Sequence, residues 1–305
     1  MSSRQSPEGR QAPHGHRLPA VWRRRDIERA GLPRYAADDQ PGIRGELRDG
    51  AGFVLVHGLL DGIGADASSA AAAARLREFG RALGRLLAQN HDREDLVEIA
   101  DFSDVDDFDD RGYRSPGELQ PHTDPPPLIA LLCLRPARDG GANRLVSAAA
   151  IRAAIRQTDP DLLARLEAGF AFFLPDEKTK GAGRASQPIP VLLEGPDGIS
   201  CVYYRPFIER VAEATGRSLP SEAIAALDLF DRLASDPAFY IRHTLAPGEL
   251  LILNNYRVLH AREEFEDWPE KHRRRCLLRL WLDADWLPEP PAAHAGRRDP
   301  MASLL

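Results

Sequence analysis

The chain has 305 residues, with 40 basic against 46 acidic side chains and a formal net charge of −6. This length suits one large domain or two small ones, and the charge argues against nucleic acid or an anionic membrane as the main partner. No apolar run reaches membrane-spanning length, and residues 1–20 lack the apolar core of a signal peptide. Three cysteines without CxxC spacing lie in apolar contexts, so we expect reduced thiols in a cytoplasmic protein: Cys133, Cys201 and Cys276.

The first third of the chain opens with a polar segment and continues with short apolar runs. Residues 1–20 are rich in Pro, Gly, Ser and Arg, which predicts a disordered tail. Residues 52–60 predict a strand between glycines, and the apolar stripe over residues 66–89 predicts a helix. Six aspartates follow between residues 101 and 110. We interpret them as a solvated loop, because the spacing of a calcium-binding loop is absent.

The remainder of the chain alternates between short strands and helices. The unbroken apolar run 128–134 predicts a strand that is covered on both faces. The other predicted elements are helices at 148–157, 160–168 and 221–234, strands at 189–193 and 199–204, and a hairpin formed by 239–245 and 250–253. The polar segment 175–190 is equally compatible with a lid and with a plain loop. The pattern predicts a mainly β fold with inserted helices: one jelly-roll domain over residues 21–290, followed by a C-terminal tail over 291–305.

A His-x-Asp pair, His122 and Asp124, is the first candidate for chemistry. Residues i and i+2 of a strand share a face, so both side chains reach the same point. A third imidazole, from His260 on a distant predicted strand, would complete a 2-His-1-carboxylate triad, which holds Fe(II) and leaves coordination positions open. The pair alone is a weak signal, since a histidine beside an N-capping aspartate is a common alternative.

Support for a metal comes from the strand predicted over residues 273–282. Arg275 and Arg279 lie four residues apart and therefore share one face with Leu277, inside an otherwise apolar segment. Buried guanidinium groups are costly unless they meet anions, and their planar fork binds a carboxylate bidentately. A metal triad beside carboxylate-binding arginines is what a 2-oxoglutarate-dependent oxygenase needs.

Taken together, these motifs resemble the taurine dioxygenase/TfdA family of Fe(II)- and 2-oxoglutarate-dependent oxygenases over roughly residues 45–285. In chain order the motifs are Gln120-Pro121-His122-Thr123-Asp124, Gly140-Gly141, Pro247-Gly248-Glu249, Asn255-Tyr256-Arg257-Val258-Leu259-His260 and Arg275-(x3)-Arg279. The stretch around His260 is also similar to γ-butyrobetaine hydroxylase.

The resemblance implies a distorted double-stranded β-helix in which His122, Asp124 and His260 bind the iron. It also implies that Arg275 binds the carboxylate of 2-oxoglutarate that is remote from the metal. Arg279 would lie near that carboxylate, in a position that often meets an anionic group of the substrate.

At one position the chain departs from the family pattern. Many relatives carry a threonine shortly after the Gly-Gly pair to bind 2-oxoglutarate, whereas this chain has Asn143, whose amide can donate the same hydrogen bond. The implied reaction is hydroxylation of an unactivated C–H bond of a small molecule, with Fe(II), 2-oxoglutarate and O2. Asp124 argues against halogenation, because a carboxylate fills the coordination position that a halide needs.

Three alternatives stay open at this stage. Desaturation or epoxidation would use the same iron site. A zinc metallohydrolase would use the same three ligands to activate water, but it leaves both arginines unexplained. A binding protein with a jelly-roll fold and no catalysis is the third. The substrate and the oligomeric state are not indicated by the sequence. Candidates for lining the substrate pocket are Tyr113, Tyr203, Arg205 and Arg257, although a structural salt bridge or surface contact explains the two arginines equally well.

Overall fold

The structure is a computed structural model that describes residues 19–63, 69–90, 92–102, 114–175, 183–195 and 197–296. Residues 1–18 of the predicted N-terminal tail, most of the aspartate-rich loop and most of the predicted C-terminal tail lie outside these ranges.

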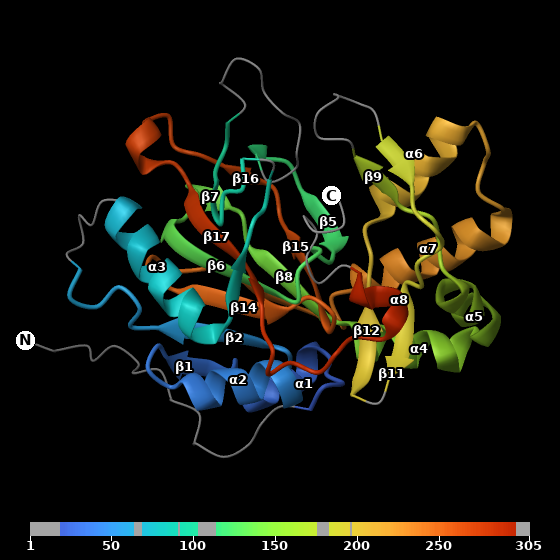
Figure 1. The fold of residues 1–305 in the computed structure, drawn as a ribbon, viewed down its shortest axis with the longest axis horizontal. Helices are drawn as coiled ribbons and strands as arrows, with labels where there is room; N and C mark the ends of the chain where they lie inside the picture. Colours follow the sequence, from blue (N-terminus) through green and yellow to red (C-terminus); the bar gives the residue numbers. More distant parts are fainter. Residues whose placement is uncertain are drawn as a thin grey trace, which may run out of the picture.

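Helices and strands alternate along the described chain (Figure 1). The helices are α1 Arg24–Ala30, α2 Gln40–Asp49, α3 Ser69–Leu83, α4 Ala148–Thr158, α5 Pro160–Ala168, α6 Arg205–Thr215, α7 Ser221–Ala234 and α8 Ala292–Ala295. The strands of the first half are β1 Arg34–Ala36, β2 Phe53–His57, β3 Arg85–Leu87, β4 Leu96–Ile99, β5 Leu119–His122, β6 Leu128–Arg135, β7 Asp139–Gly140 and β8 Asn143–Ser147. Those of the second half are β9 Phe173–Pro175, β10 Gly183–Ala185, β11 Leu192–Gly195, β12 Gly198–Cys201, β13 Tyr240–His243, β14 Leu250–Asn254, β15 Val258–Arg262, β16 Phe265–Glu266 and β17 Cys276–Asp283.

Two sheets pack face to face and form the predicted jelly roll. The larger sheet has seven strands in the order β1-β2-β14-β6-β17-β3, with β4 also paired to β17. The smaller sheet has four strands in the order β13-β8-β15-β5. Helices α4, α5 and α7 pack on the outer face of the smaller sheet, and α2 and α3 cover the larger one (Figure 1). The predicted mainly β fold with inserted helices is confirmed.

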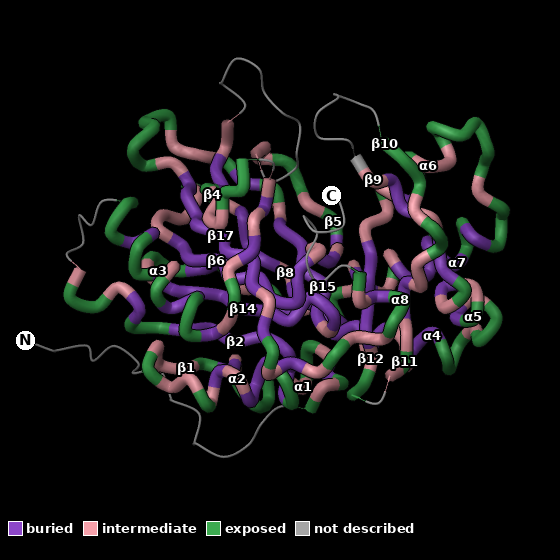
Figure 2. The backbone as a smooth tube through the Cα atoms, in the orientation of Figure 1, coloured by how far each residue is buried: buried purple, intermediate pink, exposed green. Residues whose placement is uncertain are grey.

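Strand β17 shows how the sequence pattern builds these layers. Leu277 and Trp281 are buried between the two sheets, in the same cluster as Val258 of β15. Leu278 and Leu280 point to the opposite face and pack beneath α2 and α3. Burial of each leucine stabilises the fold by about 1.5–3 kcal/mol, so the alternation fixes which residues face the interior of the barrel. Figure 2 shows this continuous buried layer through β6, β14 and β17.

The helix predicted over residues 66–89 is shorter than expected. α3 ends at Leu83, and the apolar residues that follow belong to strand β3. Gly84 lies between the two elements. A Cβ atom at this position would lie 2.2 Å from the carbonyl oxygen of Asp283 in β17. The backbone of the α3–β3 turn therefore approaches β17 too closely for any larger residue.

The hairpin predicted over residues 239–253 is wrong. β13 belongs to the smaller sheet and β14 to the larger one, so the turn between them carries the chain from one sheet to the other. Glu249 holds this turn in place. Its carboxylate lies 2.7 Å from Nε2 of His243 and 2.6 Å from Nη1 of Arg34.

Four of the described helices were not predicted: α1, α2, α6 and α8. The first residue of α6, Arg205, forms ion pairs with Asp228 and Asp231 of α7, at 2.7 and 2.6 Å. At the end of the described chain, α8 occupies part of the predicted C-terminal tail, and its buried His294 lies 2.7 Å from the hydroxyl of Ser200. Among the helices of the described ranges, none combines the length and apolar character needed to cross a bilayer.

Candidate metal centre

The three residues of the predicted triad meet at one point between two strands of the smaller sheet. His122 ends β5 and pairs in register with His260 of β15, and their rings lie 4.3 Å apart. Asp124 follows two residues after His122. Ligand atoms of all three residues lie within 4.8 Å of one another, and this is the one such group of metal-binding side chains in the described part of the chain.

The backbone around Asp124 is held from two sides. The side chain of the buried Asn255 donates to the carbonyl oxygen of Pro126 at 2.9 Å, and its amide oxygen accepts from the N–H of Asp124 at 3.4 Å. On the other side, Thr123 and Tyr203 exchange two hydrogen bonds, of 2.9 and 3.0 Å. The position of Asp124 is therefore fixed by neighbouring segments before any ligand binds.

The ring nitrogens of the two histidines have different surroundings. Nδ1 of His122 lies 2.8 Å from the carbonyl oxygen of Gln120 and donates to it, so Nε2 is the nitrogen left for a metal. Burial, with a contribution from His122, lowers the pKa of His260 to about 3. A neutral ring nitrogen is the form that binds a metal.

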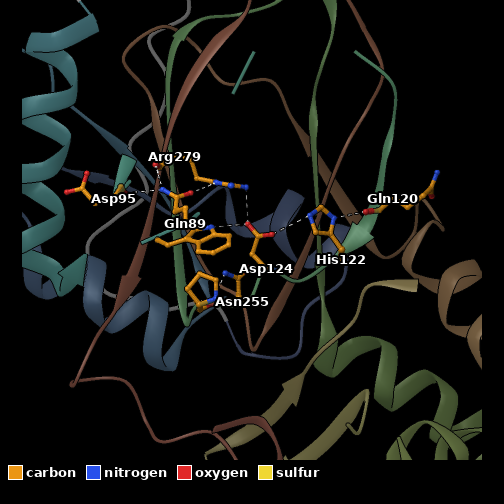
Figure 3. A network of polar contacts seen from close by, with 9 residues as sticks. Gln89, Asp95, Gln120, His122, Asp124, Asn255 and Arg279 are labelled. Carbon is orange, nitrogen blue, oxygen red and sulfur yellow. Dashed lines mark hydrogen bonds and ion pairs between the residues drawn. The ribbon is translucent and has the colours of Figure 1, made fainter. Parts of the chain in front are cut away.

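The carboxylate of Asp124 has two different oxygens (Figure 3). Oδ2 accepts from Nε1 of Trp281 at 3.3 Å and from Nη1 of Arg279 at 3.5 Å. Oδ1 lies 3.9 Å from Nε2 of His122. Burial alone would raise the pKa of Asp124, but Arg279, the two histidines and Trp281 outweigh it and lower that pKa. The carboxylate is therefore ionised, with one oxygen occupied by donors and the other directed toward the histidines.

Arg279 is itself anchored. Its Nε donates to Oε1 of Gln89 at 2.7 Å, and Nε2 of Gln89 donates back to the Arg279 carbonyl oxygen at 2.9 Å (Figure 3). The structure thus places Arg279 beside Asp124, and it does not line the cavity that contains Arg275.

This donor set fits a mononuclear metal. Two imidazole nitrogens and one carboxylate oxygen on one side of a site are typical of Fe(II) in oxygenases. In addition, the buried Nδ1 atom of His260 has no hydrogen-bond partner within the described residues. A buried polar atom without a partner requires an explanation, and a bound ion is one.

A second group of predicted residues lines one small cavity. Arg275 and Asn143 both line it, together with Thr244. Arg275 is 4% exposed, burial lowers its pKa, and its Nη1 atom has no partner within the described residues. Gly141 packs against it, since a Cβ at that glycine would lie 3.4 Å from Nε of Arg275. The cavity thus offers a guanidinium nitrogen without a partner and an amide, which suits a carboxylate.

Sequence reasoning missed several residues at these two places. Trp281 was detectable, because it lies two positions after Arg279 and so shares its face of β17. Gln89 was hidden by its assignment to the end of the predicted helix. Thr244 follows β13 and reaches the cavity only through the crossing between sheets, for which the sequence contains no local signal.

Other candidates for lining a substrate pocket have structural contacts instead. The hydroxyl of Tyr203 donates to Asp231 at 2.5 Å, within the same ion network as Arg205. Arg257 donates to the carbonyl oxygen of Arg48. Tyr113 lies outside the described residues.

A mononuclear metal triad within a two-sheet jelly roll defines a class of non-haem metal proteins, and comparison with known proteins narrows that class. The chain belongs to the TauD/TfdA family: the model described as "Taurine catabolism dioxygenase TauD, TfdA family" matches residues 18–281.

Two curated relatives show how far the similarity extends. FR-33289 synthase from Streptomyces rubellomurinus is 30% identical over 212 residues, which cover 68% of this chain and 62% of that protein. Uridine-5′-phosphate dioxygenase from an Amycolatopsis species is 27% identical over 158 residues, which cover 50% of this chain and 54% of that protein. The chain therefore matches less than two thirds of the length of each.

Solved structures have the same fold, a double-stranded β-helix. An asparagine oxygenase in complex with Fe(II), 3-hydroxyasparagine and succinate superposes with a TM-score of 0.60 at 19% identity, over 81% of this chain and 78% of that one. The non-heme iron oxygenase OrfP, in complex with Fe and alpha-ketoglutaric acid, gives a TM-score of 0.56 at 16% identity, over 80% and 79%.

Proposed function

We propose that this chain is an Fe(II)- and 2-oxoglutarate-dependent dioxygenase that hydroxylates an unactivated C–H bond of a small molecule. The observation that carries the proposal is the meeting of His122, Asp124 and His260 within 4.8 Å, in a barrel whose interior also contains the unpaired Nη1 of Arg275. Family membership supports the same reaction class.

In this proposal His122, Asp124 and His260 hold Fe(II), and Arg275 binds the distal carboxylate of 2-oxoglutarate with help from the amide of Asn143. When bound together, iron, 2-oxoglutarate and O2 supply oxidation of the C–H bond, with one oxygen atom entering the product and the other entering succinate as CO2 is released. The protein orients the co-substrate and keeps the cavity dry.

Arg279 was predicted as a further co-substrate residue. Its contact with Asp124 places a positive charge directly beside the metal ligand. We propose that this charge keeps the Asp124 carboxylate ionised and limits its rotation. An anionic group of the substrate would therefore contact Arg279 beside the metal site, and not in the cavity that Arg275 lines.

The remaining features of the proposal follow from the sequence and the fold. The substrate is a small molecule, and residues 21–290 form one catalytic domain. A cytoplasmic location is supported by three cysteines that are all buried and free: Cys133, Cys201 and Cys276.

The test is substrate-stimulated formation of succinate. The protein is incubated with Fe(II), 2-oxoglutarate, O2 and a panel of amino acids, sulfonates, phosphorylated nucleosides and carrier-bound acyl groups. We expect one class to raise the rate of succinate formation and to gain one oxygen atom derived from O2. Retained turnover in Asp124→Ala, or hydrolytic activity that depends on zinc alone, would contradict the proposed function.

A further inference from the structure

A second arginine, Arg262, lies on the inner face of the barrel close to the metal site. It follows His260 by two residues on β15, and β15 pairs continuously with β8 from Val258 to Arg262, so both side chains share one face. Its partner in that register is Asn143, which lines the cavity of Arg275. Arg262 therefore shares a face of the smaller sheet with His260 and Asn143, although its side chain is not among those that line the cavity of Arg275.

The guanidinium of Arg262 is only partly satisfied. Nη2 donates to the carbonyl oxygens of Ser115 and Gly117, at 2.7 Å for the first. Nε and Nη1 are buried and have no partner within the described residues, and the whole residue is 4% exposed. Two backbone carbonyls offer dipoles but no negative charge, so the cation is buried without a hydrogen-bonded carboxylate.

Arg262 and Arg275 lie around the same aromatic ring. Their guanidinium carbons are 4.9 and 5.1 Å from the centre of the Phe265 ring. The nearby carboxylate of Asp267 accepts from the backbone N–H of Arg275 at 2.8 Å. Nη1 of Arg275 remains without a partner, as do two nitrogens of Arg262.

Two like charges in this position are costly. The charge of Asp101 opposes that of Arg275 at this position. A buried charge without a hydrogen-bonded anion destabilises the folded state unless an anion reaches it. An anion bound between β15, β8 and the start of β17 would therefore be stabilised by both guanidinium groups.

We propose that Arg262 is a second cation of the co-substrate site, which acts with Arg275 to select 2-oxo acids that carry a distal carboxylate. The inference rests on the proposed function, because it takes the anion to be 2-oxoglutarate. The competing explanation is that Arg262 only holds the segment 115–117 that leads into β5. The two explanations differ in which ligands should be affected when Arg262 is replaced.

The experiment titrates two ligands anaerobically into Fe(II)-loaded protein and follows the visible charge-transfer band. The ligands are 2-oxoglutarate and 2-oxopentanoate, which has the same carbon chain without the distal carboxylate. The variants are Arg262→Gln and Arg262→Lys. The control is Arg144→Gln, because Arg144 is a largely buried arginine on the opposite face of β8, where it forms an ion pair with Glu118.

We expect Arg262→Gln to weaken 2-oxoglutarate by at least about tenfold and 2-oxopentanoate by less than about twofold, as loss of a charge-assisted contact requires. Arg262→Lys should fall between wild type and Arg262→Gln, and Arg144→Gln should match wild type for both ligands. Equal weakening of both ligands would overturn the inference in favour of a structural role, and no change in either would overturn it outright. Absence of the band in wild type would instead refute the proposed function.

Discussion

At the scale of single residues, the two oxygens of Asp124 carry the most information. Trp281 and Arg279 both donate to Oδ2, and Oδ1 lies on the side of His122. Replacing a group that holds a metal ligand in place typically lowers metal affinity about 10- to 100-fold. The indole of Trp281 and the guanidinium of Arg279 therefore belong to the metal site, although neither would bind the metal.

Removing the indole donor tests this role. Trp281→Phe keeps an aromatic ring on the inner face of β17 but leaves Oδ2 with Arg279 as its one remaining donor, so the carboxylate is held less firmly. We expect Fe(II) affinity to fall about 10- to 100-fold, measured by anaerobic Fe(II) titration. The matched control is Trp22→Phe, because the indole of Trp22 is also buried and donates to the carbonyl oxygen of Ala51 at 2.8 Å. An equal loss of affinity in both variants would show a general effect of core packing.

The two arginines of β17 should respond differently to replacement by lysine. In Arg275→Lys, the planar fork that suits a carboxylate is lost, so 2-oxoglutarate affinity should fall by at least about tenfold while Fe(II) affinity is unchanged. In Arg279→Lys, the contact with Asp124 is weakened, so the affinity for Fe(II) should fall more than the affinity for 2-oxoglutarate. Binding of each ligand is measured separately in each variant. Equal losses of 2-oxoglutarate affinity would contradict this division of roles.

At the scale of elements, sequence patterns succeeded where one segment determines its own structure. The two faces of β17 were predicted from its alternating residues, and in the structure each face is buried in a different core. Helix α7 was predicted over its full length because its apolar stripe is regular. The helix over residues 66–89 extended too far, because β3 is also apolar and the close approach of Gly84 to β17 is a tertiary contact. The turn before β14 was taken for a hairpin, since a turn between two sheets has the same local sequence.

Glu249 links the elements at that turn and should make stability depend on pH. Burial alone would raise its pKa, but the hydrogen bond to His243, the charge of that residue and the contacts with Ala246 and Arg34 lower it to about 2, from 4.5. The folded state thus holds the proton less tightly than the unfolded state. This contribution to stability is complete above pH 4.5 and is lost as the pH falls toward 2.

The prediction is checked by urea unfolding between pH 2 and pH 6 in wild type and Glu249→Gln. The substitution should cost about 1.5–3 kcal/mol at pH 6, the usual contribution of hydrogen bonds to a charged group. It should also flatten the decrease in the free energy of unfolding between pH 4.5 and pH 2. An equally steep decrease in the variant would show that other carboxylates cause it.

At the scale of the whole molecule, the site is assembled from distant parts of the chain. The three side chains that meet at the candidate metal site were predicted from the sequence, because the His-x-Asp pair and a later histidine are local patterns supported by family motifs. It did not contain the pairing of β5 with β15, nor the path that brings Gln89 of the β3 region to β17. These contacts depend on strand order, which no single segment specifies.

The charge distribution is also a property of the whole fold. The chain has a net charge of −6, yet three arginines are buried on the strands of the barrel: Arg262, Arg275 and Arg279, of which Arg279 contacts Asp124. Because the interior is more positive than the surface, an anion binds more favourably inside the barrel than on the outside of the protein. A dicarboxylate that chelates a metal at one end is the ligand that matches this distribution.

The most direct test of the account is an anaerobic titration of 2-oxoglutarate into Fe(II)-loaded protein. Chelation of iron by the keto oxygen and the adjacent carboxylate should produce a weak visible charge-transfer band that saturates at one 2-oxoglutarate per site. His260→Ala, which removes one of three metal ligands while the fold persists, should abolish the band. A wild-type protein that binds Fe(II) but never develops the band, or a band of unchanged intensity in His260→Ala, would contradict the account.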